Sequence, residues 1–130
     1  MITPFHIGDR KQITHLVTPA DAATFITGNV HPVYATFAVA REAEWACRQF
    51  VLEMREADEE GIGTFVTVEH RSPALIGQEV LFTATIESIT GNHVICAYEA
   101  RVGERLIASG RQGQKILKKE RIGQLFDSIR

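Results

Sequence analysis

The stretch Thr36 to Ala57, TFAVAREAEWACRQFVLEMREA, decides the fold. It contains neither Gly nor Pro, and most of its residues are good or acceptable helix formers. At about 100° per residue, its apolar side chains gather on one face of a helix and its polar side chains fall opposite. The apolar face comprises Val39, Ala40, Ala43, Ala46, Cys47, Phe50, Val51 and Met54, and the polar face comprises Glu42, Gln49, Glu53 and Glu56. The sequence therefore predicts one long helix with a buried side.

Two polar residues of this helix have more than one interpretation. Thr36 suits an N-cap, because its hydroxyl can accept a hydrogen bond from a free amide of the first turn. The same helix N-terminus can also bind an anion or a developing oxyanion. Glu44 lies at the edge of the apolar face, and Arg48 four residues later predicts a surface ion pair. From the pattern alone we favour the cap and the ion pair over a catalytic use of either residue.

The rest of the chain has the periodicity of β-strands. Hydrophobic and β-branched residues are concentrated in five stretches, at 11–17, 63–70, 79–88, 93–101 and 106–115. The connections at Gly91-Asn92 and Gly103-Glu104 are short enough for hairpins. We therefore expect residues 80–115 to form an antiparallel meander.

The remaining segments complete an α+β pattern. Thr18-Pro19 predicts the start of a short helix that runs to about Ile26, and residues 118–130 predict a basic terminal helix or tail. One long helix followed by antiparallel strands predicts a single domain over residues 1–130, with the sheet curled around the helix. Because such a sheet has open edges, we expect a homodimer or a larger assembly.

The composition argues against nucleic acid and membranes as partners. The chain has 130 residues, a formal net charge of -2 and 23% charged residues, so it offers no strong basic field. It has no apolar signal segment, and no run approaches the roughly 20 apolar residues of a membrane span. Cys47 and Cys96 lie in apolar patterns without zinc-site spacing. We expect them to be reduced core residues of a cytoplasmic protein.

One of the strand-like stretches, GTFVTVEH, carries further candidate site residues. His70 closes it, and a histidine at a strand end is most often structural, although its ring is also a general base near neutral pH. Gly63 and Thr64 open it and are most simply the entry of the strand. A glycine at that point also lets a ligand approach the backbone. Composition and spacing alone support no named reaction.

Several motifs taken together resemble the fluoroacetyl-CoA thioesterase family of the hotdog fold. They are Ala35-Thr36, Glu44-Trp45-Ala46-Cys47, Gly61-Ile62-Gly63-Thr64, VTVEHRSP at 66–73 and Ile107-Ala108-Ser109-Gly110. The likeness extends over about residues 11–117. Its specific part is the spacing, with a threonine eight residues before the glutamate and a histidine seven residues after the glycine. The resemblance implies an antiparallel sheet of about five strands around one long central helix, and dimers with active sites at their interface.

The resemblance also implies hydrolysis of an acyl-CoA thioester, and we expect neither a cofactor nor a metal. The family's catalytic residues fall on Thr36, Glu44 and His70, and its substrate-contacting glycine falls on Gly63, next to Thr64. Thioester hydrolysis needs a nucleophile or activated water, a proton acceptor and donors for the oxyanion. His70 would act as base or keep a partner ionised. Glu44 would attack directly or activate water, and Thr36 would position the reacting groups or serve as nucleophile. We expect the three catalytic side chains to converge on one pocket at a subunit interface.

One departure from the family bears on the substrate. Fluoroacetyl-specific members carry phenylalanines just ahead of the catalytic threonine, whereas residues 28–33 (GNVHPV) contain none. This favours a short-chain or small aromatic acyl-CoA over fluoroacetyl-CoA. Two alternatives stay open at the level of sequence: an acyl-CoA hydratase or dehydratase of the same fold, and a non-catalytic acyl-CoA-binding protein.

Overall fold

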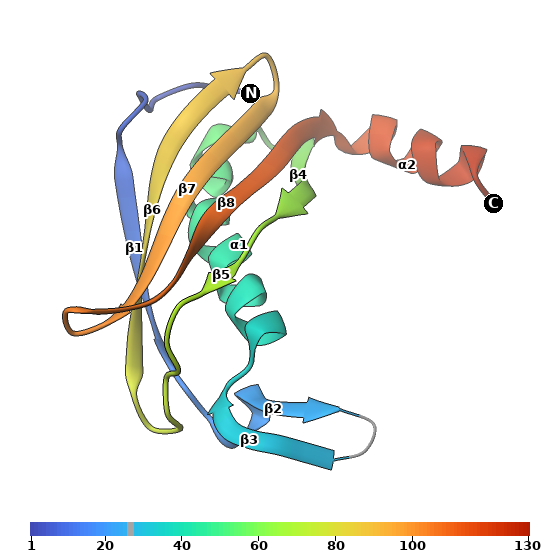
Figure 1. Cartoon of the computed structure of the whole chain (residues 1–130). Coiled ribbons are helices and arrows are strands. Elements are labelled where there is room, and N and C mark those ends of the chain that lie inside the picture. The colour runs from blue at the N-terminus through green and yellow to red at the C-terminus, as the bar shows by residue number, and fades with distance from the viewer. Residues whose placement is uncertain (26–27) are drawn as a thin grey trace.

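A computed structural model describes residues 1–25 and 28–130 of the chain (Figure 1). The two helices are α1 (Thr36–Met54) and α2 (Lys119–Ser128). The strands are β1 (Arg10–Leu16), β2 (Ala22–Phe25), β3 (Gly28–Tyr34), β4 (Glu59–Val66), β5 (Glu69–His70), β6 (Glu79–Thr90), β7 (His93–Val102) and β8 (Arg105–Lys118). A single 3-10 turn, Pro19–Asp21, precedes β2.

An antiparallel sheet curls around α1, as the sequence predicts (Figure 1). Among the described residues its strand order is β1-β6-β7-β8-β4, and the short β5 also pairs with β8. The meander β6-β7-β8 is confirmed. Its two hairpin turns place Gly91 at φ +60° and Gly103 at φ +58°, a conformation that glycine adopts without strain. β2 and β3 form a separate hairpin ahead of α1.

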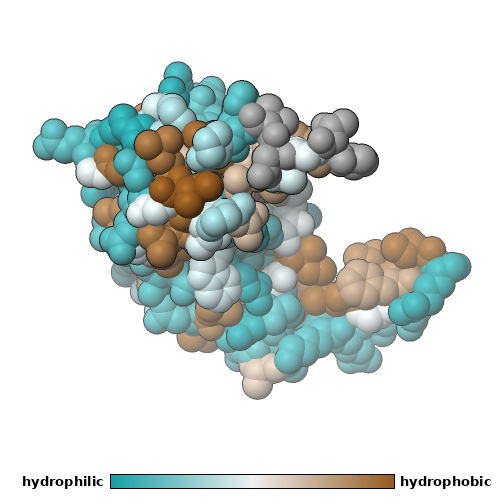
Figure 2. Space-filling view, turned by 90° about the horizontal axis from the view of Figure 1, so that it is seen from below, coloured by the Kyte–Doolittle hydropathy of each residue, from teal (hydrophilic) through white to brown (hydrophobic). Residues whose placement is uncertain are grey.

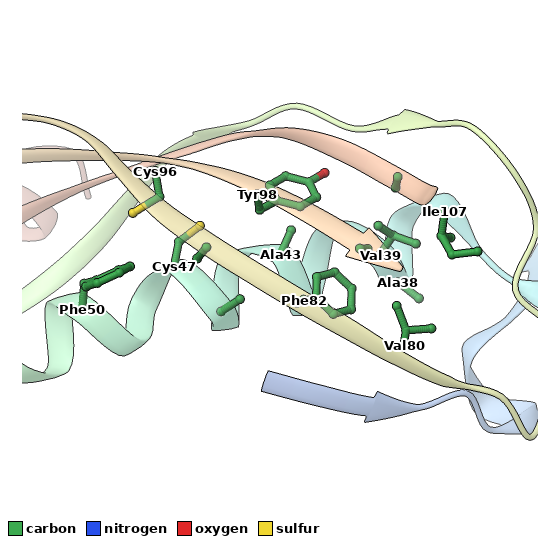
Figure 3. Close-up of a cluster of buried hydrophobic side chains, with 14 of the residues drawn as sticks. Ala38, Val39, Ala43, Cys47, Phe50, Val80, Phe82, Cys96, Tyr98 and Ile107 are labelled. Atoms are coloured by element: carbon green, nitrogen blue, oxygen red, sulfur yellow. The ribbon is translucent and has the colours of Figure 1, made fainter. Parts of the chain in front are cut away.

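The predicted apolar face of α1 lies against the concave side of this sheet. Its residues Val39, Ala43, Ala46, Cys47, Phe50, Val51 and Met54 are all buried. Figure 3 shows this face packed against side chains from β6, β7 and β8, including Phe82, Tyr98 and Ile107. Cys47 and Cys96 are buried free cysteines that lie near each other in this core (Figure 3). Of the helices described, neither combines the length and hydropathy needed to cross a membrane.

The segment before α1 departs from the prediction. The expected helix from Thr18 is wrong, because only the turn Pro19–Asp21 is helical and Ala22–Phe25 form a strand. The predicted end of that helix at Ile26 lies outside the described residues. The start signal itself is real, since the Asp21 carboxylate accepts a hydrogen bond from the Thr18 amide at 2.9 Å. Pairing of β2 with β3 then replaces further helical turns.

β4 also differs from the prediction: it spans Glu59–Val66 rather than 63–70, and Glu69–His70 form the separate short strand β5. The predicted helix is three residues too long, because α1 ends at Met54 rather than Ala57, and Glu59 and Glu60 begin β4. The long β8 extends to Lys118 and pairs Lys118 with Glu59, so β4 starts four residues earlier than expected. β4 is an outer strand of the sheet within the described chain.

Glu42 is the clearest error in the predicted faces of α1, because it is buried rather than exposed. Its carboxylate accepts hydrogen bonds from the Tyr34 hydroxyl at 2.6 Å and from Nε of Arg41 at 2.5 Å. Arg41 also donates to Asp21 at 2.6 Å, and His15 lies 2.8 Å from the same aspartate. This polar cluster joins β1, the 3-10 turn, β3 and the first turns of α1.

The cluster keeps the Asp21 carboxylate ionised. Burial opposes ionisation of Asp21, but the Thr18 amide, Arg41 and His15 outweigh it and lower the pKa of Asp21 to about 2. Since the pKa of Asp21 is lower in the folded chain than in the unfolded chain, its contribution to stability is present above the ordinary carboxyl pKa. That contribution is lost as the pH falls toward about 2.

We expect Glu42→Ala to lower the free energy of unfolding by about 1–3 kcal/mol, because it leaves the buried Tyr34 hydroxyl without its carboxylate acceptor, whereas the exposed Arg41 keeps its bond to Asp21. Urea unfolding followed by circular dichroism measures this. Glu53→Ala on the same helix is the matched control. Its exposed pair with Lys11 contributes about 1 kcal/mol or less, so a similar loss in both variants would contradict the assigned role of the cluster.

Candidate active site

Thr36 and His70 meet at the start of α1. Thr36 is the first residue of the helix, and its Oγ1 lies 2.9 Å from Nδ1 of His70. The predicted N-cap role of Thr36 is wrong, because Ala35 occupies the cap position and no side chain makes a cap hydrogen bond there. The hydroxyl is engaged by the histidine instead. The structure therefore pairs a hydroxyl with an imidazole, the arrangement that activates a serine or threonine nucleophile.

The backbone of β5 and the following turn hold His70 in place. His70 pairs with Ala108 of β8, and the amides of Arg71 and Ser72 donate to the carbonyl oxygen of Ile107 at 2.7 and 3.2 Å. Nε2 of His70 is buried and has no hydrogen-bond partner among the described residues. Burial lowers the pKa of His70 below its ordinary value, and the Ser72 backbone offsets part of this effect. The ring is therefore a neutral proton acceptor at neutral pH.

This lowered pKa predicts the pH dependence of any reaction in which His70 is the base. The imidazole is active when neutral, so kcat/KM should fall on acidification only below pH 6.5, the ordinary histidine value. A profile of kcat/KM from pH 4.5 to 9 measures the midpoint of this acid limb. An acid limb that persists with the same midpoint in His70→Ala would show that His70 is not the titrating base. His70→Ala should remove the limb from whatever activity remains.

The chain enters α1 along a fixed path. The Tyr34 amide donates to the carbonyl oxygen of Ala74 at 2.8 Å, and the Ala35 amide donates to that of Asp21 at 2.9 Å. The first amides of a helix lack intrahelical acceptors and lie at the positive end of the helix dipole. The start of α1 therefore offers oxyanion donors beside the Thr36 hydroxyl.

Aromatic surface lies next to Thr36. Phe37 follows it on α1 and makes an edge-to-face contact with Phe25 of β2, with ring centroids 6.2 Å apart. Both rings are more than half exposed. Residues 28–33 contain no phenylalanine, but Phe25 of β2 and Phe37 of α1 form an aromatic surface beside Thr36.

Glu44 belongs to a second group of residues, on β4 and the middle of α1. It lines a cavity of about 270 Å³ with Gly63, Thr64, Phe65, Val66 and Gln112. Its Oε1 lies only 2.5 Å from the point where a Cβ on Gly63 would stand. The carboxylate therefore rests against the bare backbone of Gly63.

The predicted ion pair between Glu44 and Arg48 is wrong. Arg48 donates instead to Glu60 of β4 at 2.6 Å, and Arg55 binds the other oxygen of the same carboxylate. Glu44 is exposed in the single chain and forms no ion pair with any residue that the structure describes. A carboxylate with no structural partner is available for other chemistry.

We expect Gly63→Ala to lower kcat/KM of any reaction that uses Glu44 by about 10-fold to 10²-fold. The added methyl group forces the Glu44 carboxylate away from its position. The free energy of unfolding should change little, since Glu44 is flexible and exposed. Steady-state kinetics and urea unfolding measure the two effects. The double variant Gly63→Ala/Glu44→Ala should be no less active than Glu44→Ala alone, and fully additive losses would contradict this explanation.

Sequence reasoning missed the polar floor of this cavity. Gln112 and Gln114 of β8 are buried, and Nε2 of Gln114 donates to Oε1 of Gln112 at 3.1 Å. Nε2 of Gln112 donates to the carbonyl oxygen of Gly113. The available signal is their spacing of two in a strand, which places both on the inward face among apolar residues. Thr64, at the cavity rim, contacts Nε2 of His93 through its hydroxyl at 3.0 Å.

In one copy of the chain the three predicted catalytic residues do not meet. Thr36 and His70 form one group, and Glu44 with Gly63 and Thr64 forms the other. Eight residues of α-helix separate Thr36 from Glu44, a rise of about 12 Å. This is too far for both side chains to act on one carbonyl carbon within a single copy.

Comparisons with known proteins place the chain in a family. Residues 17–120 match the family described as fluoroacetyl-CoA-specific thioesterase. A comparison with curated proteins finds no match.

Similar solved structures share the fold. A Thermus thermophilus hypothetical protein, a thioesterase superfamily member, is 36% identical with a TM-score of 0.93, over 98% of this chain and 95% of that one. The fluoroacetyl-CoA thioesterase itself is 23% identical with a TM-score of 0.88, over 97% and 98%. A hot-dog-like protein from Thermanaerovibrio acidaminovorans is 17% identical with a TM-score of 0.87, over 95% and 92%. With its long helix inside a curled antiparallel sheet, the chain has the hotdog fold and belongs to the fluoroacetyl-CoA-specific thioesterase family.

Proposed function

We propose that residues 1–130 form one acyl-CoA thioesterase domain, which hydrolyses a short-chain or small acyl-CoA to the free acid and CoA. The observation that carries this proposal is the hydrogen bond between Oγ1 of Thr36 and Nδ1 of His70 at the start of α1. It joins a nucleophile and a neutral base beside a helix N-terminus, the three elements that acyl transfer requires. Membership of a thioesterase family supports the same reaction class.

In this proposal Thr36 attacks the thioester carbonyl carbon and His70 accepts its hydroxyl proton. The amides at the start of α1 stabilise the oxyanion. The C–S bond then breaks, the CoA sulfur takes the proton from His70, and an acyl ester of Thr36 results. Glu44 acts in the second step, where its carboxylate accepts a proton from the water that attacks this ester. The ester C–O bond then breaks, and Glu44 returns this proton to the departing Thr36 oxygen, so that the acid leaves and both the Thr36 hydroxyl and the Glu44 carboxylate are restored.

We further propose that the site is completed in a homodimer, with Glu44 of one copy facing Thr36 and His70 of the other. The separation of about 12 Å along α1 supports this, because one copy cannot bring Glu44 to the Thr36 hydroxyl. The open outer edge of β4 supports it as well. Gly63 lies on that strand and directly beneath Glu44, so pairing there brings the Glu44 cavity to the interface.

The proposed substrate follows from the surroundings of Thr36 and Glu44. The aromatic surface of Phe25 and Phe37 beside Thr36 favours an apolar acyl group, and a cavity of about 270 Å³ favours a small one. A variant of the fluoroacetyl-CoA thioesterase was solved with fluoroacetate and CoA, at 24% identity to this chain. We extend CoA recognition, but not selectivity for fluoroacetate, to this chain.

The test is release of free CoA thiol from acetyl-, propionyl-, butyryl-, phenylacetyl- and fluoroacetyl-CoA by the purified, folded chain. We expect turnover of at least one ester, with fluoroacetyl-CoA not preferred over acetyl-CoA. Crotonyl-CoA is included because its hydration without thiol release would indicate a hydratase. Tight binding of these esters in calorimetry, with no thiol release from any of them, would contradict an enzymatic role.

A further inference from the structure

The helix α2 has an apolar side that its own chain leaves uncovered. Ile122, Leu125, Phe126 and Ile129 recur at the spacing of one helix face, and the side chains on the opposite face are charged or polar. None of the residues of α2 is buried in the single chain, and Leu125, Phe126 and Ile129 are 45%, 48% and 76% exposed. Figure 2 shows α2 extending away from the rest of the molecule, with hydrophobic surface along one side.

The direction of α2 is set at the edge of the sheet. Lys118, the last residue of β8, pairs with Glu59, the first residue of β4. The Lys119 amide donates to the carbonyl oxygen of Asp58 at 2.8 Å, and Nζ of Lys118 lies 3.1 Å from the Asp58 carboxylate. α2 therefore leaves the sheet from a fixed corner and extends past β4 (Figure 1).

A helix in this position needs a surface to pack on. Helices of ten residues are marginal in water without tertiary contacts, and exposed apolar stripes mark interaction sites. The alignment with the Thermus thermophilus structure leaves out only 2% of this chain, fewer residues than α2 contains. The alignment with this solved relative, which has an overall TM-score of 0.93, therefore reaches into α2.

The open edge of β4 indicates what covers the stripe. Within residues 1–25 and 28–130 no strand pairs with this edge, and such an edge is a template for another copy. Two-fold antiparallel pairing of β4 with its copy sets the Glu59 end of one strand beside the Val66 end of the other. α2 leaves from the Glu59 end, so it extends over the second copy near Val66, whose side chain is exposed.

We propose that α2 is an intersubunit arm whose apolar stripe (Ile122, Leu125, Phe126 and Ile129) packs on a second copy of this chain beyond the β4 edge. This inference rests on the homodimer of the proposed function. It assigns to α2 a role in holding the two copies together, separate from the residues that carry out the reaction.

Sedimentation analysis of the full chain tests the arm without any substrate. We expect Phe126→Asp to raise the dimer dissociation constant by about 100-fold or more, because it places a carboxylate in an apolar contact on both arms. Gln124→Asp adds the same charge to the opposite face of the same helix and should leave the constant within about threefold of wild type. A monomeric wild-type chain, or equal constants in the two variants, would overturn the proposal.

Hydrogen exchange of the wild-type chain tests the proposal without any substitution, so its result does not depend on whether a variant folds. The amides of α2 should be protected from hydrogen exchange above the dimer dissociation constant and should exchange rapidly below it. Equal protection of these amides above and below the dimer dissociation constant would overturn the proposal that α2 packs on a second copy. Because neither readout involves thiol release, a chain without thioesterase activity can still carry the arm, and an active thioesterase can still lack it.

Discussion

Replacing His70 by alanine is expected to lower kcat/KM for the best acyl-CoA ester by about 10²-fold or more. In the proposed mechanism His70 removes the Thr36 proton during attack, and the 2.9 Å between Oγ1 of Thr36 and Nδ1 of His70 supports this role. Without the ring, the Thr36 hydroxyl has no acceptor at that position and keeps its proton. Thiol release at saturating and subsaturating substrate should show the loss mainly in kcat, because the ring contacts the nucleophile rather than the CoA moiety.

The matched control for this prediction is His6→Ala. His6 is a fully solvated histidine in the N-terminal segment, and its side chain is 89% exposed. Its replacement should leave kcat/KM within about twofold of wild type. Circular dichroism and urea unfolding establish that both variants are folded. If folded His70→Ala turns over substrate at the wild-type rate, His70 is a structural residue and the proposed mechanism fails.

The parts of the fold that sequence predicts well are those set by local periodicity. The apolar repeat of α1 and the alternation of β6, β7 and β8 each reflect one face turned to a common core. Turn residues such as Gly91 and Gly103 then determine how neighbouring strands connect. These signals lie within a few residues of one another, so they are visible without knowledge of the tertiary structure.

Errors arise where distant residues compete with a local signal. Thr18 and Asp21 do start a helical turn, but pairing between β2 and β3 stops it after Pro19–Asp21. Arg48 has a glutamate four residues before it in sequence, yet it binds Glu60 from the neighbouring strand. In both cases a partner that is remote in sequence forms the more complete interaction, which no pattern of neighbours reveals.

The burial of Glu42 also depends on residues that are distant in sequence, so the charge pattern of α1 does not predict it. It lies on the polar face of α1 as predicted, but that face is covered at its start by Asp21, Tyr34 and His15 from preceding segments. A carboxylate that looks solvated on a helical projection is therefore buried among hydrogen-bonding partners. Only the path of the chain into α1 makes this visible.

For the candidate site, sequence identifies the residues but not the contacts between them. Spacing shared with a family selects Thr36, Glu44, His70 and Gly63, and the structure supplies the contacts Thr36–His70 and Glu44–Gly63. Those contacts span 34 residues of sequence in the first case, so no local pattern predicts them. Gln112 escapes both approaches, because two inward-facing glutamines in one strand, Gln112 and Gln114, carry no chemical signature by themselves.

The joint use of Thr36, His70 and a partner's Glu44 is the central claim, and a mixed dimer tests it most directly. Glu44→Ala and His70→Ala chains with different affinity tags are co-expressed, and the heterodimer is purified through both tags. In a site built from two copies, one site then carries both substitutions and the other carries neither.

We predict that this heterodimer recovers about half of the wild-type kcat/KM for thiol release, although each parent homodimer falls by about 10²-fold or more. A heterodimer of two Glu44→Ala chains, carrying the same tags, controls for the tags and should stay as inactive as its parent. If the mixed heterodimer is no more active than the two parents, Glu44 and His70 do not act together across the interface, and the proposed site is contradicted.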